Sequence, residues 1–186
     1  MKIVENTLSE DAQNQLVSLV GQKLEYVTGL GIKRFLASAM LLIVTADLVV
    51  DISATIVNED FPGFREDFGR IRVGDSLESD ISAAQRESTR FFKFSGEEIE
   101  RVLIRRSTMT KTENGTGVWQ YVSDIAIHFQ VSSGWFALSL LNHHDQVLTV
   151  TYAANDEQLE IPETDSLFES DLFEKYEVSL DDFEIS

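Results

Sequence analysis

Apolar positions near the start of the chain recur at the spacing of an amphipathic helix. Ser9 stands before them as a residue that can cap a helix, and the two acidic residues after it suit the first helical turn. The pattern therefore predicts a helix that begins after Ser9, ends near Gly21 and packs one side against a core. The apolar residues of that side are Ala12, Leu16, Leu19 and Val20.

Beyond residue 22 the period of the pattern shortens to two, which is typical of β-strands. Segments 35–44 and 48–57 flank a short polar stretch at 45–47, and this arrangement predicts a hairpin. In the second arm apolar residues alternate with mainly polar ones, as expected for a sheet with one face toward water.

Segment 58–69 has the composition of a loop, because it contains two glycines and a proline among acidic residues. Phe61, Phe64 and Phe68 lie in the same segment. They either pin the loop to the core or give it an exposed aromatic edge for binding. Segment 78–88 has no pattern that decides between helix and strand.

The second half of the chain has the pattern of an antiparallel meander. Asn114-Gly115 is a strong signal for a two-residue hairpin turn. Short connections favour antiparallel pairing over alternating β-α-β units, so the sequence predicts an α+β fold with a mostly antiparallel sheet. The expected strands are 70–78, which is brief and ends in a turn, 89–94, 99–110, 118–131, 135–141 and 147–153.

Two stretches of the chain resemble each other. LEYVTGLGI at 24–32 and WQYVSDIAI at 119–127 share a pattern of bulky, polar and branched residues, and each precedes a strand, a tight turn and a returning strand. This similarity is explained either by internal duplication of a meander unit or by convergence, because half-buried strands draw on a restricted set of residues.

The C-terminal segment differs from the rest in charge. Residues 155–186 hold 12 acidic side chains and one basic one, whereas residues 1–154 are predicted to form a single α+β domain. Asp165 can cap a short acidic helix whose apolar residues would dock the segment on the domain, and the last ten residues are expected to fray. The apolar residues of this helix are Leu167, Phe168, Leu172, Phe173 and Tyr176.

Composition narrows the class of protein. The chain has 186 residues, is 43% hydrophobic and contains no cysteine, so it can bury a core but cannot form disulfides or thiolate metal sites. The N-terminus lacks the apolar stretch of a signal peptide, and the most apolar segment, 35–50, is too short for a membrane helix. These features predict a cytoplasmic protein that does not associate with membranes.

The formal net charge of −17 indicates the kind of partner. Such a field repels nucleic acid and attracts basic surfaces. The favoured hypothesis is a non-enzymatic binding module for a basic protein, such as an immunity protein that inhibits a basic toxin. The alternative explanation is that acidity only maintains solubility. A further alternative is a nucleic-acid mimic, in which carboxylates imitate phosphates.

No stretch carries a catalytic signature, so no catalytic residue and no cofactor are predicted, and an enzymatic role stays open. His143 and His144 lie in a predicted turn and His128 lies on a nearby strand, which suggests a second hypothesis of a small-molecule or metal-binding domain. Adjacent turn residues point in different directions, so a solvated polar turn explains these histidines better and no metal ligands are predicted.

The candidate partner-binding residues are acids of the C-terminal segment and aromatic residues of the predicted sheet and of the 58–69 loop. Acids would steer a basic partner, and aromatic side chains would anchor it. The arginines of segment 99–110 and the glutamates just before and within it are expected to form exposed cross-strand ion pairs. The candidates are Asp165, Glu169, Asp171, Glu174, Asp181, Asp182, Phe61, Phe64 and Trp135.

Overall fold

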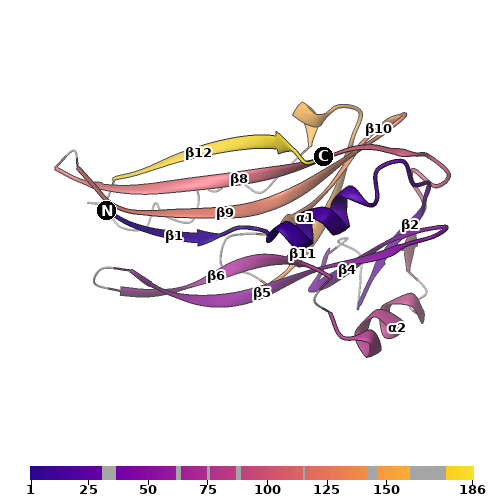
Figure 1. The fold of residues 1–186 in the computed structure, drawn as a ribbon, viewed down its shortest axis with the longest axis horizontal. Helices are drawn as coiled ribbons and strands as arrows, with labels where there is room; N and C mark the ends of the chain where they lie inside the picture. The colour runs from indigo at the N-terminus through magenta and orange to yellow at the C-terminus, as the bar shows by residue number, and fades with distance from the viewer. Residues whose placement is uncertain are drawn as a thin grey trace.

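The structure is a computed structural model in which two β-sheets lie in layers with a helix between them (Figure 1). The seven-stranded sheet has the order β12-β8-β9-β10-β11-β3, and β1 pairs with β9. The five-stranded sheet has the order β6-β5-β4-β2-β7. The described residues are 1–30, 37–61, 64–74, 76–86, 89–114, 116–141, 146–159 and 175–186.

Nearly all pairs of the described strands are antiparallel, as the sequence predicted, and among them only β1 runs parallel to its neighbour β9. The elements are β1 (Lys2–Asn6), α1 (Glu10–Val17), β2 (Leu24–Gly29), β3 (Ala37–Ser38), β4 (Met40–Thr45), β5 (Val49–Phe61), β6 (Phe64–Val73), α2 (Glu78–Arg86), β7 (Arg90–Phe91), β8 (Ile99–Glu113), β9 (Thr116–Val131), β10 (Gly134–Leu140), β11 (Leu148–Ala153), a 3₁₀ turn η1 (Asp156–Gln158) and β12 (Lys175–Glu184). The predicted strands 99–110, 118–131, 135–141 and 147–153 correspond to β8, β9, β10 and β11.

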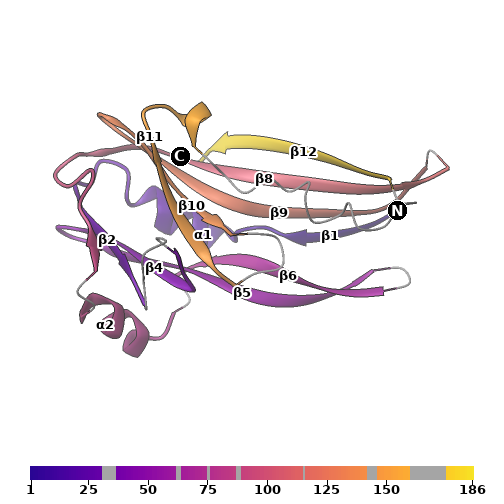
Figure 2. The same ribbon diagram turned by 180° about the vertical axis from the view of Figure 1, so that it is seen from behind.

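The β8–β9 hairpin forms the long axis of the molecule (Figure 2). Glu113 pairs with Thr116 across its turn, and Asn114 has a φ of 51°, the left-handed conformation that an Asn-Gly turn requires. The register shifts near its middle, where Arg105 faces Ala126 and the next residue of β8 faces Asp124. This bulge re-aims the side chains of β9 at that point.

The first helix begins after Ser9, as the sequence predicted, but it ends at Val17, before the predicted end near Gly21. The Ser9 side chain accepts a hydrogen bond from the backbone N–H of Ala12, and the helix brings Leu16 and Leu19 to positions with no exposed surface. Val20 is an exception, because 39% of it is exposed just beyond the helix. Gly21 follows with a φ of 82°, a conformation that glycine adopts without strain.

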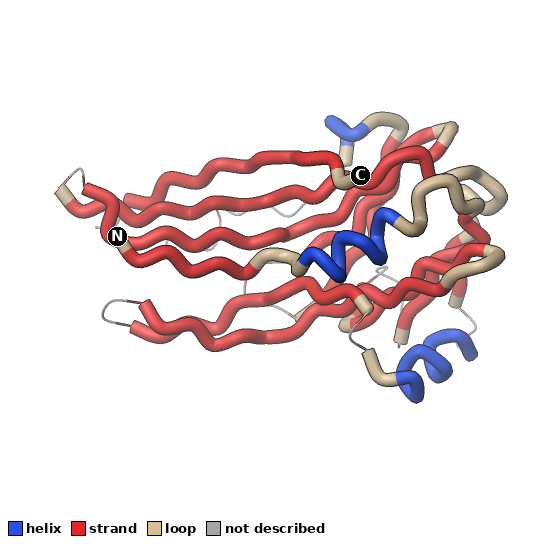
Figure 3. The backbone as a smooth tube through the Cα atoms, in the orientation of Figure 1, coloured by secondary structure: helices blue, strands red, loops and turns tan. Residues whose placement is uncertain are grey.

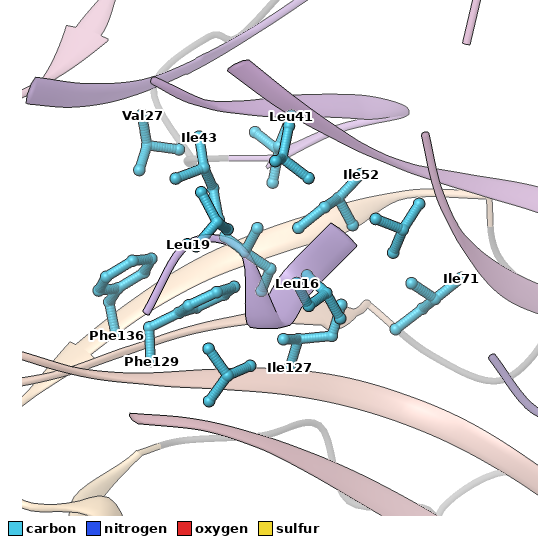
Figure 4. Close-up of a cluster of buried hydrophobic side chains, with 14 of the residues drawn as sticks. Leu16, Leu19, Val27, Leu41, Ile43, Ile52, Ile71, Ile127, Phe129 and Phe136 are labelled. Carbon is cyan, nitrogen blue, oxygen red and sulfur yellow. The ribbon is translucent and has the colours of Figure 1, made fainter. Parts of the chain in front are cut away.

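Leu16 and Leu19 lie between the two sheets in Figure 4. On one side of them are apolar residues of the five-stranded sheet, and on the other side are apolar residues of the seven-stranded sheet. This arrangement gives the two sheets a common core in which the helix fills the space between them. The labelled neighbours are Val27, Leu41, Ile43, Ile52 and Ile71 of the first sheet and Ile127, Phe129 and Phe136 of the second.

The second helix, α2, occupies the segment to which the sequence assigned no structure. Figure 3 shows it on the outer side of the five-stranded sheet, where Ile81 and Ala84 pack against Met40, Leu42 and Val44 of β4. Because β4 is covered by the core on one face and by α2 on the other, all six of its residues are buried. Burial on both faces explains its unbroken apolar sequence.

The prediction of a loop at 58–69 is wrong for most of its length. Strands β5 and β6 continue until Phe61 pairs with Phe64. Cross-strand contacts between polar residues support this hairpin: Asn58 donates to Asp67 over 2.7 Å, and Arg65 forms an ion pair with Asp60. The turn-forming residues had suggested a loop, but Gly69 pairs with Ile56 within the hairpin.

The end of the chain also differs from its prediction. The last ten residues do not fray, because β12 pairs with β8 along its whole length and Ile185 is buried. Most of the predicted acidic helix, residues 165–174, lies outside the described residues. Tyr176, which was assigned to that helix, belongs to β12. The predicted strand 89–94 is reduced to β7, Arg90–Phe91.

The two similar stretches lie in different sheets. Residues 24–29 form β2, which pairs antiparallel with β4, and residues 119–127 belong to β9, which pairs antiparallel with β10. The aligned tyrosines have different surroundings, because Tyr26 packs with the α2 cluster whereas Tyr121 stacks on Phe68. Internal duplication therefore stays a hypothesis.

Truncation of Leu16 tests the role of α1 in joining the sheets. We expect Leu16→Ala to lower the free energy of unfolding by about 3 kcal/mol, because it leaves a cavity in the shared core. Val20→Ala is the matched control and should cost less than about 0.5 kcal/mol, since Val20 is 39% exposed. Urea denaturation measures both values, and equal losses would contradict a central position for the helix.

Candidate functional site

The candidate site lies on the face of the seven-stranded sheet that points away from α1. Along β9, Ile127 and Phe129 face the shared core, so His128 between them faces the opposite side. His128 lies across from Leu103 of β8 and Ala137 of β10. This face therefore carries polar and charged groups on strands whose other face is apolar.

Two ion pairs join β8 to the C-terminal strand on this face. Arg101 Nη2 lies 2.6 Å from Glu184 Oε2, and Arg105 Nε donates to Asp182 Oδ1 over 2.7 Å. Both nitrogens of the Arg105 fork contact the carboxylate, so this pair is bidentate. The sequence predicted cross-strand ion pairs for these arginines, but the acids that pair with them come from β12.

The ion pairs set the protonation of their acids. Burial raises the pKa of the Asp182 carboxyl, but hydrogen bonds from Arg105 and its charge outweigh burial and hold that pKa below its ordinary value. The hydrogen bond from Arg101 lowers the pKa of Glu184 in the same direction. Both carboxylates stay charged at neutral pH, and both are occupied within the protein.

His128 is fully buried beside this ladder, with 0% of its side chain exposed. Its Nδ1 lies 2.6 Å from Asp156 Oδ1, a contact that holds η1 against the sheet. Burial lowers the pKa of the imidazole, and attraction to Asp156 only partly opposes this effect. His128 is therefore neutral at pH 7, with the proton on Nδ1 donated to Asp156 and a lone pair on Nε2.

The Nε2 atom of His128 is buried and has no hydrogen-bond partner. The Oγ1 atom of Thr151 is also buried without a partner, two strands away on β11, and Ala137 stands between the two residues in the sheet register. A carboxylate that orients an imidazole is an arrangement found in catalytic and metal sites. Within the described part of the chain, however, no group of three potential ligands could hold a metal ion.

The predicted partner-binding residues have different positions. Asp181 and Asp182 lie on β12, where Asp181 is exposed and Asp182 is bound to Arg105. Trp135 is half-buried on β10, opposite Gln130 and Ala153. The backbones of Phe61 and Phe64 end the β5–β6 hairpin. The remaining candidates, Asp165, Glu169, Asp171 and Glu174, lie outside the described residues, as do His143 and His144.

Sequence reasoning missed Asp156 and Glu184 as members of this face. Asp156 follows Asn155, whose side chain caps η1 by accepting from the backbone N–H of Gln158. An Asx residue before two acids is a recognisable cap signal, but it does not indicate which strand the turn contacts. Glu184 lies in the C-terminal segment, for which composition indicated an acidic charge but no strand.

Comparison with known proteins adds no assignment. No family model, no curated protein and no solved structure matches the chain. Among the described residues no helix is long and apolar enough to cross a membrane. The site must therefore be interpreted from its own geometry.

The buried imidazole predicts a specific pH dependence. Because the folded-state pKa of His128 lies below its unfolded value, the unfolded chain binds a proton first as the pH falls, and this part of the stability is lost below about pH 6.5. We expect NMR titration to give His128 a pKa below that of a histidine in an unfolded peptide. Asp156→Asn should lower the pKa further, because the carboxylate favours the charged ring. A pKa at or above the ordinary value would contradict this geometry.

Proposed function

We propose that this protein is a non-enzymatic binding module that engages a basic protein through the acidic strand β12. The observation that supports it is an exposed strand edge: β12 pairs with β8 on one side, and no described strand pairs with the other. An open edge offers backbone N–H and C=O groups to a further strand. The proposed contact is therefore β-strand addition by a segment of the partner.

The side chains of β12 select the chemistry of the partner. Leu180 is 52% exposed, which makes it an apolar anchor next to the exposed carboxylate of Asp181. Asp182 and Glu184 are already paired with arginines, so Asp181 is the acid in this stretch for which the structure gives no ion pair. Acidic side chains discourage neutral or acidic strands from pairing at an edge, whereas a basic strand would neutralise them.

The negative net charge of the whole protein also favours a basic partner. The formal net charge is −17, and the ion pairs of Arg65, Arg101, Arg105 and Arg106 each join one acid to one base, so they leave this excess of acids unchanged. Such a surplus accelerates encounter with a basic partner and makes association sensitive to salt. A basic toxin, such as a nuclease, fits this description, and the chain would then act as an immunity-type inhibitor.

The test is capture of a partner by the immobilised full chain from an extract of its source cell. Binding is compared at about 50 mM and about 500 mM salt, where charge screening differs strongly. We expect one basic protein to be captured at low salt and weakened at high salt. The double variant Leu180→Lys with Asp181→Lys should reduce capture about tenfold or more, because it removes the anchor and reverses the charge of the edge.

The β1 strand supplies a matched control. Ile3 is also 52% exposed and lies two residues before the exposed Glu5, so Ile3→Lys with Glu5→Lys makes the same change of charge on another strand. This control should retain the partner. Equal loss in both variants, or capture of no basic protein, would refute strand β12 as the binding edge. Displacement of the captured protein by duplex DNA would instead favour the nucleic-acid mimic.

A further inference from the structure

A cavity of about 540 Å³ lies where β11 leads into η1, at the end of the molecule near the β9–β10 turn. This volume falls within the range of small-molecule sites. Among the residues that the structure describes, its lining includes one cation and two aromatic rings but no acidic side chain, although the protein has 32 acids. The lining residues are Lys93, Phe94, Ser133, Tyr152, Ala153, Ala154 and Gln158.

Lys93 is held at this cavity by aromatic rings. Its Nζ lies 5.0 Å from the ring centre of Tyr152 and 5.6 Å from that of Phe94, which are distances of cation–π contacts. The lining contains no carboxylate to neutralise the ammonium group. A cation–π contact leaves the N–H donors of lysine available, because the rings attract charge without accepting conventional hydrogen bonds.

The aromatic wall is fixed by packing. Phe94 is buried, and its ring lies 5.7 Å from that of Tyr152 and 6.3 Å from that of Phe136. Gly134 permits this position, because a Cβ there would stand 2.6 Å from the backbone oxygen of Ala153 and 3.3 Å from Phe94. The apolar side of the cavity is therefore rigid and anchored in the shared core.

Tyr152 adds a second unused donor. Its hydroxyl is buried and has no hydrogen-bond partner in the described part of the chain, which is costly for a folded protein. Burial raises the pKa of Tyr152 to about 12, so the hydroxyl keeps its proton at neutral pH. Ser133 is not available in the same way, since its hydroxyl donates to Glu97 over 2.7 Å.

We propose that this cavity binds a small aromatic carboxylate. Lys93 and Tyr152 donate to the carboxylate, and Phe94 packs against the flat ring. The Gln158 side chain is exposed at the same cavity and supplies a further amide donor. The lysine and hydroxyl donors match an anion, and aromatic walls match an apolar ring, so neither inorganic phosphate nor an uncharged ring satisfies both halves of the site.

The test is titration of the isotope-labelled full chain with benzoate at about 150 mM salt, followed by the amide resonances of Ser133, Ala153 and Ala154. We expect saturable shifts confined to these residues and their neighbours. Lys93→Gln should weaken benzoate binding about tenfold or more, and Tyr152→Phe about fivefold. Lys23→Gln is the matched control, because Lys23 is exposed elsewhere and its loss changes the net charge equally.

Inorganic phosphate tests the donors of the site alone, and benzyl alcohol tests its aromatic side alone. Each should bind at least about tenfold more weakly than benzoate. The proposal is overturned if benzoate gives no saturable shift, if Lys93→Gln binds it as well as the native chain does, or if phosphate or benzyl alcohol binds as tightly. Equal affinity in Tyr152→Phe would remove the hydroxyl from the site. This experiment uses no protein partner, so its outcome is independent of binding at β12.

Discussion

Burial of α1 between the two sheets is the constraint on which the rest of the structure depends. Leu16 of the helix and Leu19 just beyond it belong to the one core cluster that also holds apolar residues of both sheets. A polar contact fixes that position: the Asp124 carboxylate accepts hydrogen bonds from the backbone N–H of Leu8 and from Arg106, each over 2.7 Å. Asp124 is buried and fully engaged, and loss of one partner would leave a buried charge without compensation.

This constraint determines which residues can serve function. Since one face of β8 and β9 is committed to the core, Arg101, Arg105 and His128 lie on the other face, where the last strand supplies their counter-charges. Asp182 and Glu184 of β12 thus help to hold the strand on β8. An acid without such a pair is the kind that would attract a partner. Exposed ion pairs contribute little to stability individually, but this pair of contacts aligns β12 along β8.

The sequence predicted elements whose signals are local. Ser9 as a helix cap, Asn114 in its hairpin turn and the alternating strands of the meander all depend on near neighbours, and they were confirmed. Helix α2 was missed because it packs through little more than Ile81 and Ala84, too few apolar positions to show a period. Strand β12 was missed because its acidic residues obscured an alternating pattern, and its pairing with β8 joins segments far apart in the sequence. The contact between His128 and Asp156 joins residues on separate elements, which no spacing in the sequence reveals.

The lining of the cavity at Lys93 carries a positive charge, whereas the protein as a whole is strongly acidic. In a chain with a net charge of −17, a lysine would ordinarily find a carboxylate, and pairing would leave it nothing to offer a ligand. Contact with Phe94 and Tyr152 instead keeps the ammonium in place with its donors free. Strands β12 and β11 are four positions apart in the sheet order, roughly 19 Å at the usual strand spacing. A protein bound at the acidic edge and a carboxylate bound beside Lys93 would therefore contact separate groups of residues, and each can be occupied without the other.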